Sequence, residues 1–442
     1  MNQTNQTDAY DLPLSTGSPI AAERYREGIA LMLSAWPNAP GFLEAAVEAD
    51  PGFALAHAAL ARLDALAARR AEAKSRMALA VQLAEQGASE RERSHVEVLA
   101  VSISGETEKA LTHALEHADR WPRDTVVLGL PLGAFGLFAF SGMANHDQAR
   151  VDLCERHARY FAADDWWFLT YHGWSLAENG EVSRGRAMLE RAYERRAANA
   201  NGVHALLHAM FESGAHLEAE ALIAAWLPGY DRAGLLHGHI SWHATLSALE
   251  RGDADAAMAI YLDSVQPSVS QGAPINVVTD GASLLWRMDA YGYPVGEQPW
   301  RGLADYALAA FPKPGHAFTD AHMAMIEAAM HDDAAINRRC EALEDMISAG
   351  GHLAGPVVPA LCRAAFAFRN GDFAECVTLM SPVLDDVARL GGSGAQREAF
   401  EDTLLIALMQ SGEVVRAKSL LDQRLHRRPS TRDRKWLGQL SA

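Results

Sequence analysis

The sequence has few cysteines and too little positive charge for a nucleic-acid binder. Its 442 residues contain four cysteines and no Cys-x-x-Cys pair, which excludes a disulfide framework and a thiolate zinc site. Lysine and arginine together number 39, against 56 aspartates and glutamates, and the net charge of -17 disfavours contacts with phosphate groups. We therefore expect reduced thiols in a cytoplasmic protein, with no nucleic acid among its partners.

The sequence also lacks a membrane-spanning segment and a signal peptide. Its longest apolar run, residues 126–140, contains Pro131 and three glycines, and it falls short of the roughly 20 residues that a spanning helix needs. Residues 1–20 are polar and have neither an apolar core nor a basic start, so we expect a leader that is not a signal peptide. These features predict a buried helix within 126–140 and no membrane partner.

The chain does have helical periodicity throughout. Hydrophobic residues make up 49% of it, and Ala, Leu, Glu and Arg recur at helical spacing between short turns. Runs of alternating β-branched residues are absent, so the pattern predicts an all-α protein. The turns carry glycines at similar intervals, at Gly105, Gly180, Gly214, Gly252, Gly371 and Gly412.

These turns define a repeat. Gly180 and Gly214 are 34 residues apart, and Gly252 follows after 38 more. A period in the mid-thirties with alanine and glycine at fixed offsets is typical of tetratricopeptide repeats. We therefore predict a right-handed tetratricopeptide superhelix, an α-solenoid of about ten hairpins, because each hairpin buries its apolar face only by stacking on its neighbours. The expected parts are a leader at 1–20, one solenoid domain at 21–425 and a basic end at 426–442.

Three segments differ from the repeat pattern. The basic run from Arg424 to Lys435 predicts a solvated helix end followed by a tail. Residues 266–280 and 292–314 are rich in proline and glycine, so we expect lengthened loops there. Such loops either extend one face of the solenoid or close over its concave groove as a lid.

Several short motifs go beyond what repeat architecture requires. They include Phe318-Thr-Asp-Ala-His322 and Leu390-Gly-Gly-Ser-Gly-Ala-Gln-Arg397, with further matches at 12–16, 91–96, 241–243 and 250–252. In these motifs the chain resembles the tetratricopeptide repeat protein 38 family, in collinear order from residue 12 to about residue 400. The resemblance implies the solenoid fold and no particular activity. One departure is Gly133-Ala-Phe-Gly136, where the family pattern leads us to expect a histidine.

A pair of histidines four residues apart occurs in each of two successive hairpins. His204 and His208 form the first pair and His239 and His243 the second, and this spacing places each pair on one side of its helix. Counting from the turn glycines places these histidines on the first helices of their hairpins, which face the concave groove. We expect a histidine-rich groove, and its catalytic candidates are His204, His208, His243, His322 and Asp320.

Three interpretations of this groove remain open. The histidines satisfy buried polar groups, or they bind a ligand, or one of them acts as a general base oriented by a carboxylate. We favour a small-molecule site, with a hydrolase or lyase as its enzymatic version, and keep a non-catalytic scaffold for a peptide as the alternative. The candidate ligand-binding residues are His95, His239, Trp242, Asp280, Trp286, Arg287, Ser393, Gln396 and Arg397.

Ser393 and the histidine pairs each allow a second interpretation. Ser393 has a glutamine three residues later, which predicts a capping box, although its hydroxyl is also the candidate nucleophile. Two His-x-x-x-His pairs have the ligand types for zinc, but the helix of His204 lacks the glutamate of zincin proteases. We assign no metal ligand and no cofactor, and we keep a divalent ion and a homodimer as alternatives.

Overall fold

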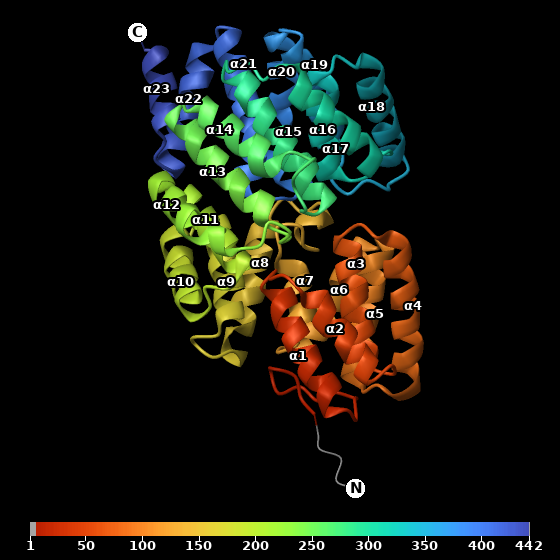
Figure 1. The fold of residues 1–442 in the computed structure, drawn as a ribbon. Helices are drawn as coiled ribbons and strands as arrows, with labels where there is room; N and C mark the ends of the chain where they lie inside the picture. The colour runs from red at the N-terminus through yellow and green to blue at the C-terminus, as the bar shows by residue number, and fades with distance from the viewer. Residues whose placement is uncertain (1–5, 442) are drawn as a thin grey trace. The chain divides into compact units, whose positions relative to one another are not determined.

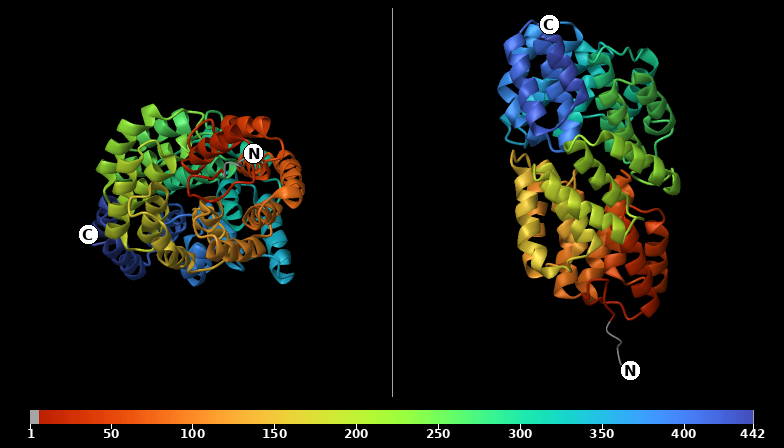
Figure 2. Two further views of the ribbon diagram at one scale, coloured as in Figure 1. Left: turned by 90° about the horizontal axis from the view of Figure 1, so that it is seen from below. Right: turned by 90° about the vertical axis from the view of Figure 1, so that its left-hand side faces the viewer.

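The protein is entirely helical over residues 6–441, which its computed structural model describes. These residues form 23 α-helices, and the β interaction among them is an isolated bridge between Thr7 and Pro13. Figures 1 and 2 show helices lying side by side in antiparallel pairs. The predicted all-α class, built of stacked helical hairpins as in an α-solenoid, is confirmed.

The chain groups into two compact units. Unit 1 contains residues 1–141, 148–175 and 187–205, and unit 2 contains residues 142–147, 176–186 and 206–442. The helices wholly in unit 1 are α1 (Pro19–Leu33), α2 (Ala39–Ala49), α3 (Ala54–Leu66), α4 (Arg70–Gly87), α5 (Glu90–Ser104), α6 (Thr107–Arg120) and α7 (Thr125–Leu132). Four helices contain residues of both units: α8 (His146–His157), α9 (Trp166–Glu178), α10 (Val182–Arg195) and α11 (Ala200–Glu212). The expected single domain over 21–425 stays a prediction.

The remaining helices belong to unit 2 alone. They are α12 (His216–Trp226), α13 (His237–Arg251), α14 (Ala254–Ile260), α15 (Pro274–Ala290), α16 (Glu297–Ala310), α17 (Ala317–Ala329), α18 (Asp333–Ser348), α19 (Val357–Arg369), α20 (Phe373–Met380), α21 (Gly394–Gln410), α22 (Val414–Arg427) and α23 (Thr431–Gln439). A π-helical turn, Tyr261–Val265, follows α14. Helix pairs such as α13 with α14 and α21 with α22 are in contact, as expected for hairpins.

The helix ends follow from local residue chemistry. Gly105 ends α5 with φ of 88° and Gly252 ends α13 with φ of 77°, a left-handed conformation that glycine adopts without a steric cost. At the start of α5, Ser89 and Glu92 form a reciprocal capping box. The turns that the glycine pattern predicts are therefore present at these positions.

Burial differs between the two helices of a hairpin. In unit 2, α13, α15 and α21 are buried along nearly their whole length, whereas α16 and α22 bury one face. A helix with neighbours on several sides keeps its polar side chains inside the protein, where they need hydrogen-bond partners. The polar residues of α13 are therefore enclosed rather than exposed on an open groove.

The predictions of two lengthened loops and of one buried apolar helix are wrong in part. Residues 292–314 contain α16, which packs through Trp300 and Leu303, and α15 already begins at Pro274. The apolar run 126–140 is helical only as far as Leu132, because Pro131 lacks the N–H needed to extend the helix. None of the helices in residues 6–441 combines the length and the apolarity of a bilayer span.

The two terminal segments are held by polar contacts. In the leader, Thr16 donates to Asp50 at 2.5 Å and the backbone N–H of Ser15 donates to Glu92 at 2.8 Å. The basic run is solvated only in part: Arg427, Arg434 and Lys435 are exposed, but Arg424 and Arg428 are only 2% and 4% exposed. Their partners are carboxylates of α21, which the sequence pattern does not place beside the run.

Candidate functional site

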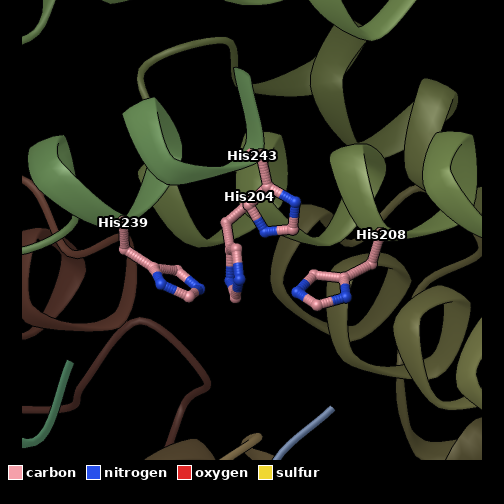
Figure 3. Close-up of side chains that lie close together, drawn as sticks. All are labelled: His204, His208, His239 and His243. Carbon is pink, nitrogen blue, oxygen red and sulfur yellow. The ribbon is translucent and has the colours of Figure 1, made fainter. Parts of the chain in front are cut away.

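Four histidines from successive hairpins converge in the structure. His204 and His208 are one turn apart on α11, and His239 and His243 are one turn apart on α13 (Figure 3). One nitrogen from each ring can be chosen so that all four lie within 4.8 Å of one another. The helix α11 is continuous from unit 1 into unit 2, so His204 keeps its place beside His208. The structure therefore brings together the two pairs that the sequence singled out.

The cluster is enclosed by protein. His208 is fully buried, His243 is 3% exposed and His239 is 5% exposed, while His204 is partly exposed. The ring centroid of His243 lies 4.6 Å from that of His208 and 5.3 Å from that of His239. Three of the four rings are therefore buried beside one another inside the protein.

Two carboxylates orient two of the rings. The Nδ1 of His239 lies 2.7 Å from the Oδ2 of Asp280, and the Nδ1 of His208 lies 3.0 Å from the Oε1 of Glu178. With its Nδ1–H donated to Asp280, the ring of His239 presents its other nitrogen, Nε2, as a lone-pair donor. This carboxylate–histidine pairing is the arrangement that accompanies metal-ligating histidines in proteins.

His243 is buried and packs against the indole of Trp242. The indole of Trp242 stacks on His239, with centroids 5.4 Å apart and planes at 11°, and packs edge-on against His243 at 5.1 Å. Burial and the neighbouring His208 and His239 hold the pKa of His243 well below its ordinary value. His243 is therefore an unprotonated imidazole at neutral pH, the form that ligates metals.

The spacing of the nitrogens suits a single ion. Neighbouring nitrogens of a tetrahedral zinc site are about 3.4 Å apart, because each zinc–nitrogen bond is about 2.0–2.1 Å. The largest separation here is 4.8 Å, so modest rotations of the side chains would bring the set to that geometry. Histidine pairs from two helices approach the common centre from two directions (Figure 3).

Glu178 belongs to a buried carboxyl pair that sequence reasoning missed. The Oε2 of Glu178 accepts the backbone N–H of Gly394 at 2.7 Å. Glu212 lies beside the same glycine, since a Cβ atom added to Gly394 would be only 2.9 Å from the Oε1 of Glu212. Burial and the charges of Glu178 and Glu398 raise the pKa of Glu212 to about 7, although Arg428 acts in the opposite direction. Glu178 and Glu212 are each the last residue of a helix, α9 and α11, and neither belongs to a recognisable motif. No signal in the sequence therefore marks them.

Replacing Glu212 by glutamine is expected to remove a pH dependence of stability. The pKa of Glu212 is about 7 in the folded protein against an ordinary 4.5, so the folded state binds more protons between these values. The free energy of unfolding therefore falls as pH rises through this window. In urea unfolding, E212Q should lose less stability than the wild type between about pH 5 and about pH 8, by up to about 3 kcal/mol. The exposed Glu108→Gln is the control, and unchanged pH dependence in E212Q would contradict the prediction.

His322 and Asp320 have partners away from the four histidines. His322 is fully buried, and its Nδ1 donates to the carbonyl of Phe318 at 2.7 Å. Burial lowers the pKa of His322 to about 4, a poor match for a general base at neutral pH. Asp320 accepts the backbone N–H groups of residues 315 and 316 at 2.9 and 2.8 Å and forms an ion pair with Arg339. The structure therefore gives Asp320 a role in holding the start of α17 rather than in orienting His322.

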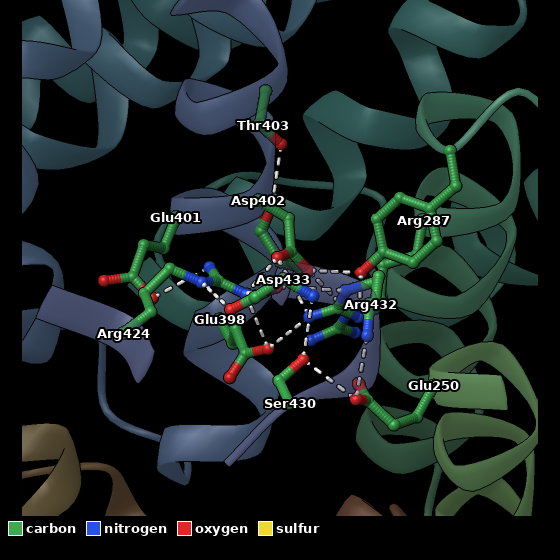
Figure 4. Close-up of polar contacts among 12 residues, drawn as sticks. Glu250, Arg287, Glu398, Glu401, Asp402, Thr403, Arg424, Ser430, Arg432 and Asp433 are labelled. Atoms are coloured by element: carbon green, nitrogen blue, oxygen red, sulfur yellow. Dashed lines mark hydrogen bonds and ion pairs between the residues drawn. The ribbon is translucent and has the colours of Figure 1, made fainter. Parts of the chain in front are cut away.

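Arg287 and Trp286 connect α15 to α21. The guanidinium of Arg287 lies 5.9 Å from the ring centroid of Trp242 and 3.3 Å from the Oδ2 of Asp402 (Figure 4). The indole N–H of Trp286 donates to Thr403 at 2.8 Å. Among the predicted ligand-binding residues, His239, Trp242 and Asp280 thus belong to the cluster, and Arg287 contacts it through Trp242.

The other predicted ligand-binding residues serve different contacts. Ser393 and Gln396 form a capping box at the start of α21, which confirms the capping interpretation of Ser393. Arg397 donates to Asp147 at 2.8 Å within unit 2. His95 lies in unit 1, where its Nδ1 is 2.9 Å from the Oδ2 of Asp124.

Comparisons with known proteins show distant similarity to helical-repeat structures. No family model matches this chain. The crystal structure of yeast Tom70 is similar with a TM-score of 0.35 and 12% identity, covering 95% of each chain. The TPR domain of P58(IPK) has a TM-score of 0.21 and 10% identity, covering 89% of each chain. The structure of Naa15/Naa10 bound to HypK-THB has a TM-score of 0.22 and 11% identity, covering 92% of this chain and 63% of that one.

Proposed function

We propose that this protein binds one divalent transition-metal ion through His204, His208, His239 and His243. The observation that carries the proposal is the convergence of four ring nitrogens within 4.8 Å. Imidazole suits zinc, copper, iron and nickel, whereas calcium and magnesium take oxygen ligands. Two histidines one turn apart chelate from one helix, so two such helices supply a complete set of four nitrogens.

The residues around the cluster support the same function. Asp280 accepts a hydrogen bond from the Nδ1 of His239, and Glu178 lies 3.0 Å from the Nδ1 of His208. Carboxylates in these places orient histidine ligands in metal sites and raise the basicity of the ligating nitrogen. The proposed site uses four imidazole nitrogens and needs no sulfur or oxygen ligand. The four cysteines are not part of it, and they are buried and free. The set therefore selects an ion with affinity for nitrogen.

The ion's proposed role is to stabilise the packing of the two helices. Four protein ligands complete a tetrahedral shell, which is typical of structural zinc, whereas catalytic zinc keeps a position open for water. We infer that the bound ion clamps α11 to α13 inside the fold. A hydrolase or lyase, a small-molecule ligand, a peptide partner, a homodimer and membership of the tetratricopeptide repeat protein 38 family stay predictions from the sequence.

A titration with cobalt tests the metal site. Full-length protein treated with chelator and then titrated with Co²⁺ should bind one equivalent, with visible absorption bands of a tetrahedral nitrogen shell that zinc removes. An ion at about 100 times its Kd adds about 2.7 kcal/mol to the free energy of unfolding, so thermal unfolding should shift upward. Calcium should have no effect. An absence of saturable binding with cobalt, zinc, nickel and copper would overturn the proposal.

Replacing Asp280 by asparagine should weaken the metal site without removing a ligand. Asparagine keeps the shape and can still accept a hydrogen bond from His239, but it loses the negative charge that raises the basicity of the ring. We expect the Kd for cobalt to rise by about 10- to 100-fold. Asp305→Asn, at an exposed position of α16, is the matched control. Equal cobalt affinity in D280N and the wild type would show that the pairing does not support a metal ligand.

A further inference from the structure

Unit 1 contains a partly open cavity that none of the four histidines lines. Its volume is about 220 Å³, which is room for a small organic molecule rather than for isolated waters. The leader, α1 and the N-terminal ends of α7 and α9 form its wall. The lining includes three acidic side chains, two basic ones and aromatic rings, among them Asp8, Asp124, Asp165, Arg26, Arg196 and Trp166.

Among the described residues Asp8 and Asp165 have no cationic partner, whereas Asp124 forms an ion pair with Arg91. Asp8 accepts the backbone N–H groups of residues 10 and 12, and Asp165 accepts the backbone N–H of Phe168, so both are held in place. Within residues 6–441 neither carboxylate forms an ion pair, and burial raises the pKa of both. A positive group in the cavity would therefore be stabilised by two fixed carboxylates.

The two basic side chains are likewise not neutralised by these acids. The guanidinium of Arg196 stacks 4.5 Å from the ring centroid of Trp166, and Arg26 donates to the carbonyl of Thr7 at 2.7 Å. The cationic side chains that act most on the carboxyls are Arg91 for Asp8 and Arg123 for Asp165, rather than the two arginines that line the cavity. The lining guanidiniums keep N–H groups that suit a carboxylate ligand.

We propose that this cavity binds a small zwitterionic molecule of the amino-acid class. Its ammonium group would lie against Asp8 and Asp165, and its carboxylate against Arg26 and Arg196. Tyr25, Ile29 and Leu33 provide an apolar wall for a hydrophobic side chain, as in other ligand pockets of mixed character. The aliphatic and aromatic lining selects apolar amino acids over strongly polar ones.

Calorimetric titration of the full-length protein tests this site with four probes. L-phenylalanine and L-leucine carry both charges, whereas 2-phenylethylamine carries only the ammonium and 3-phenylpropionate only the carboxylate. We expect at least one amino acid to bind saturably and both single-charge analogues to bind more than about tenfold more weakly. The proposal would be overturned if either analogue bound as tightly as L-phenylalanine, or if neither amino acid bound.

Substitutions in the lining locate the binding. Asp165→Asn keeps the ability to cap α9 but loses the charge, and Arg196→Gln removes the guanidinium. Each should weaken binding of the amino acid by more than about tenfold. Asp164→Asn is the matched control, because Asp164 is exposed and pairs with Arg195 on the surface. Unchanged affinity in both D165N and R196Q, with circular dichroism confirming the fold, would place any binding elsewhere and refute the site.

Discussion

Replacing His208 and His243 together by alanine is expected to abolish stoichiometric metal binding. The two rings face each other 4.6 Å apart, one from each helix, so the double variant leaves a single imidazole on α11 and a single one on α13. Loss of a ligand exceeds the effect of losing its carboxylate partner, so we expect the Kd for cobalt to rise by more than about 100-fold. Metal analysis of the purified protein and the cobalt spectrum measure this directly.

The effect on stability distinguishes a metal ligand from a structural histidine. Adding zinc should raise the unfolding temperature of the wild type and leave that of H208A/H243A unchanged. In the presence of a chelator the two proteins should differ only by the loss of packing of two side chains. His426→Ala, at an exposed position of α22, should retain the metal response of the wild type. Equal loss of stability with and without zinc would support a purely structural role and contradict the metal site.

Replacing Arg424 by methionine should destabilise the protein by about 3–5 kcal/mol, because three buried carboxylates lose a cation that they share. The guanidinium of Arg424 lies 2.7 Å from Asp433, 2.8 Å from Asp402 and 3.0 Å from Glu398 (Figure 4). All four side chains are at most 4% exposed. Urea unfolding of R424M and the wild type at neutral pH measures the difference in free energy of unfolding.

Arg427 offers a matched control on the same helix. It forms an ion pair with Glu401, but its side chain is 50% exposed, so solvent screens the interaction. Arg427→Met should change the free energy of unfolding by less than about 1 kcal/mol. Similar effects of R424M and R427M would show that burial of the network does not determine its contribution.

Several features of this protein follow from its sequence because they depend on near neighbours along the chain. The spacing of four residues puts His204 with His208, and His239 with His243, on one side of any helix. Gly252 ends α13 where the repeat pattern places a turn. Ser393 caps α21 as its motif predicts, since a capping box needs only residues within one helical turn.

Tertiary packing decided which of these local features meet. The sequence could not place the pairs of α11 and α13 within 4.8 Å, because that distance depends on how two hairpins stack. The carboxylates that orient the rings come from α9 and α15, far from their histidines in the sequence. Packing also buries His322 against Phe318 and Phe400. It buries Arg424 among acidic side chains, whereas the basic run alone indicated a solvated end. Helix periodicity is a property of the local chain, but the partners of a buried charge are set by the helices packed around it.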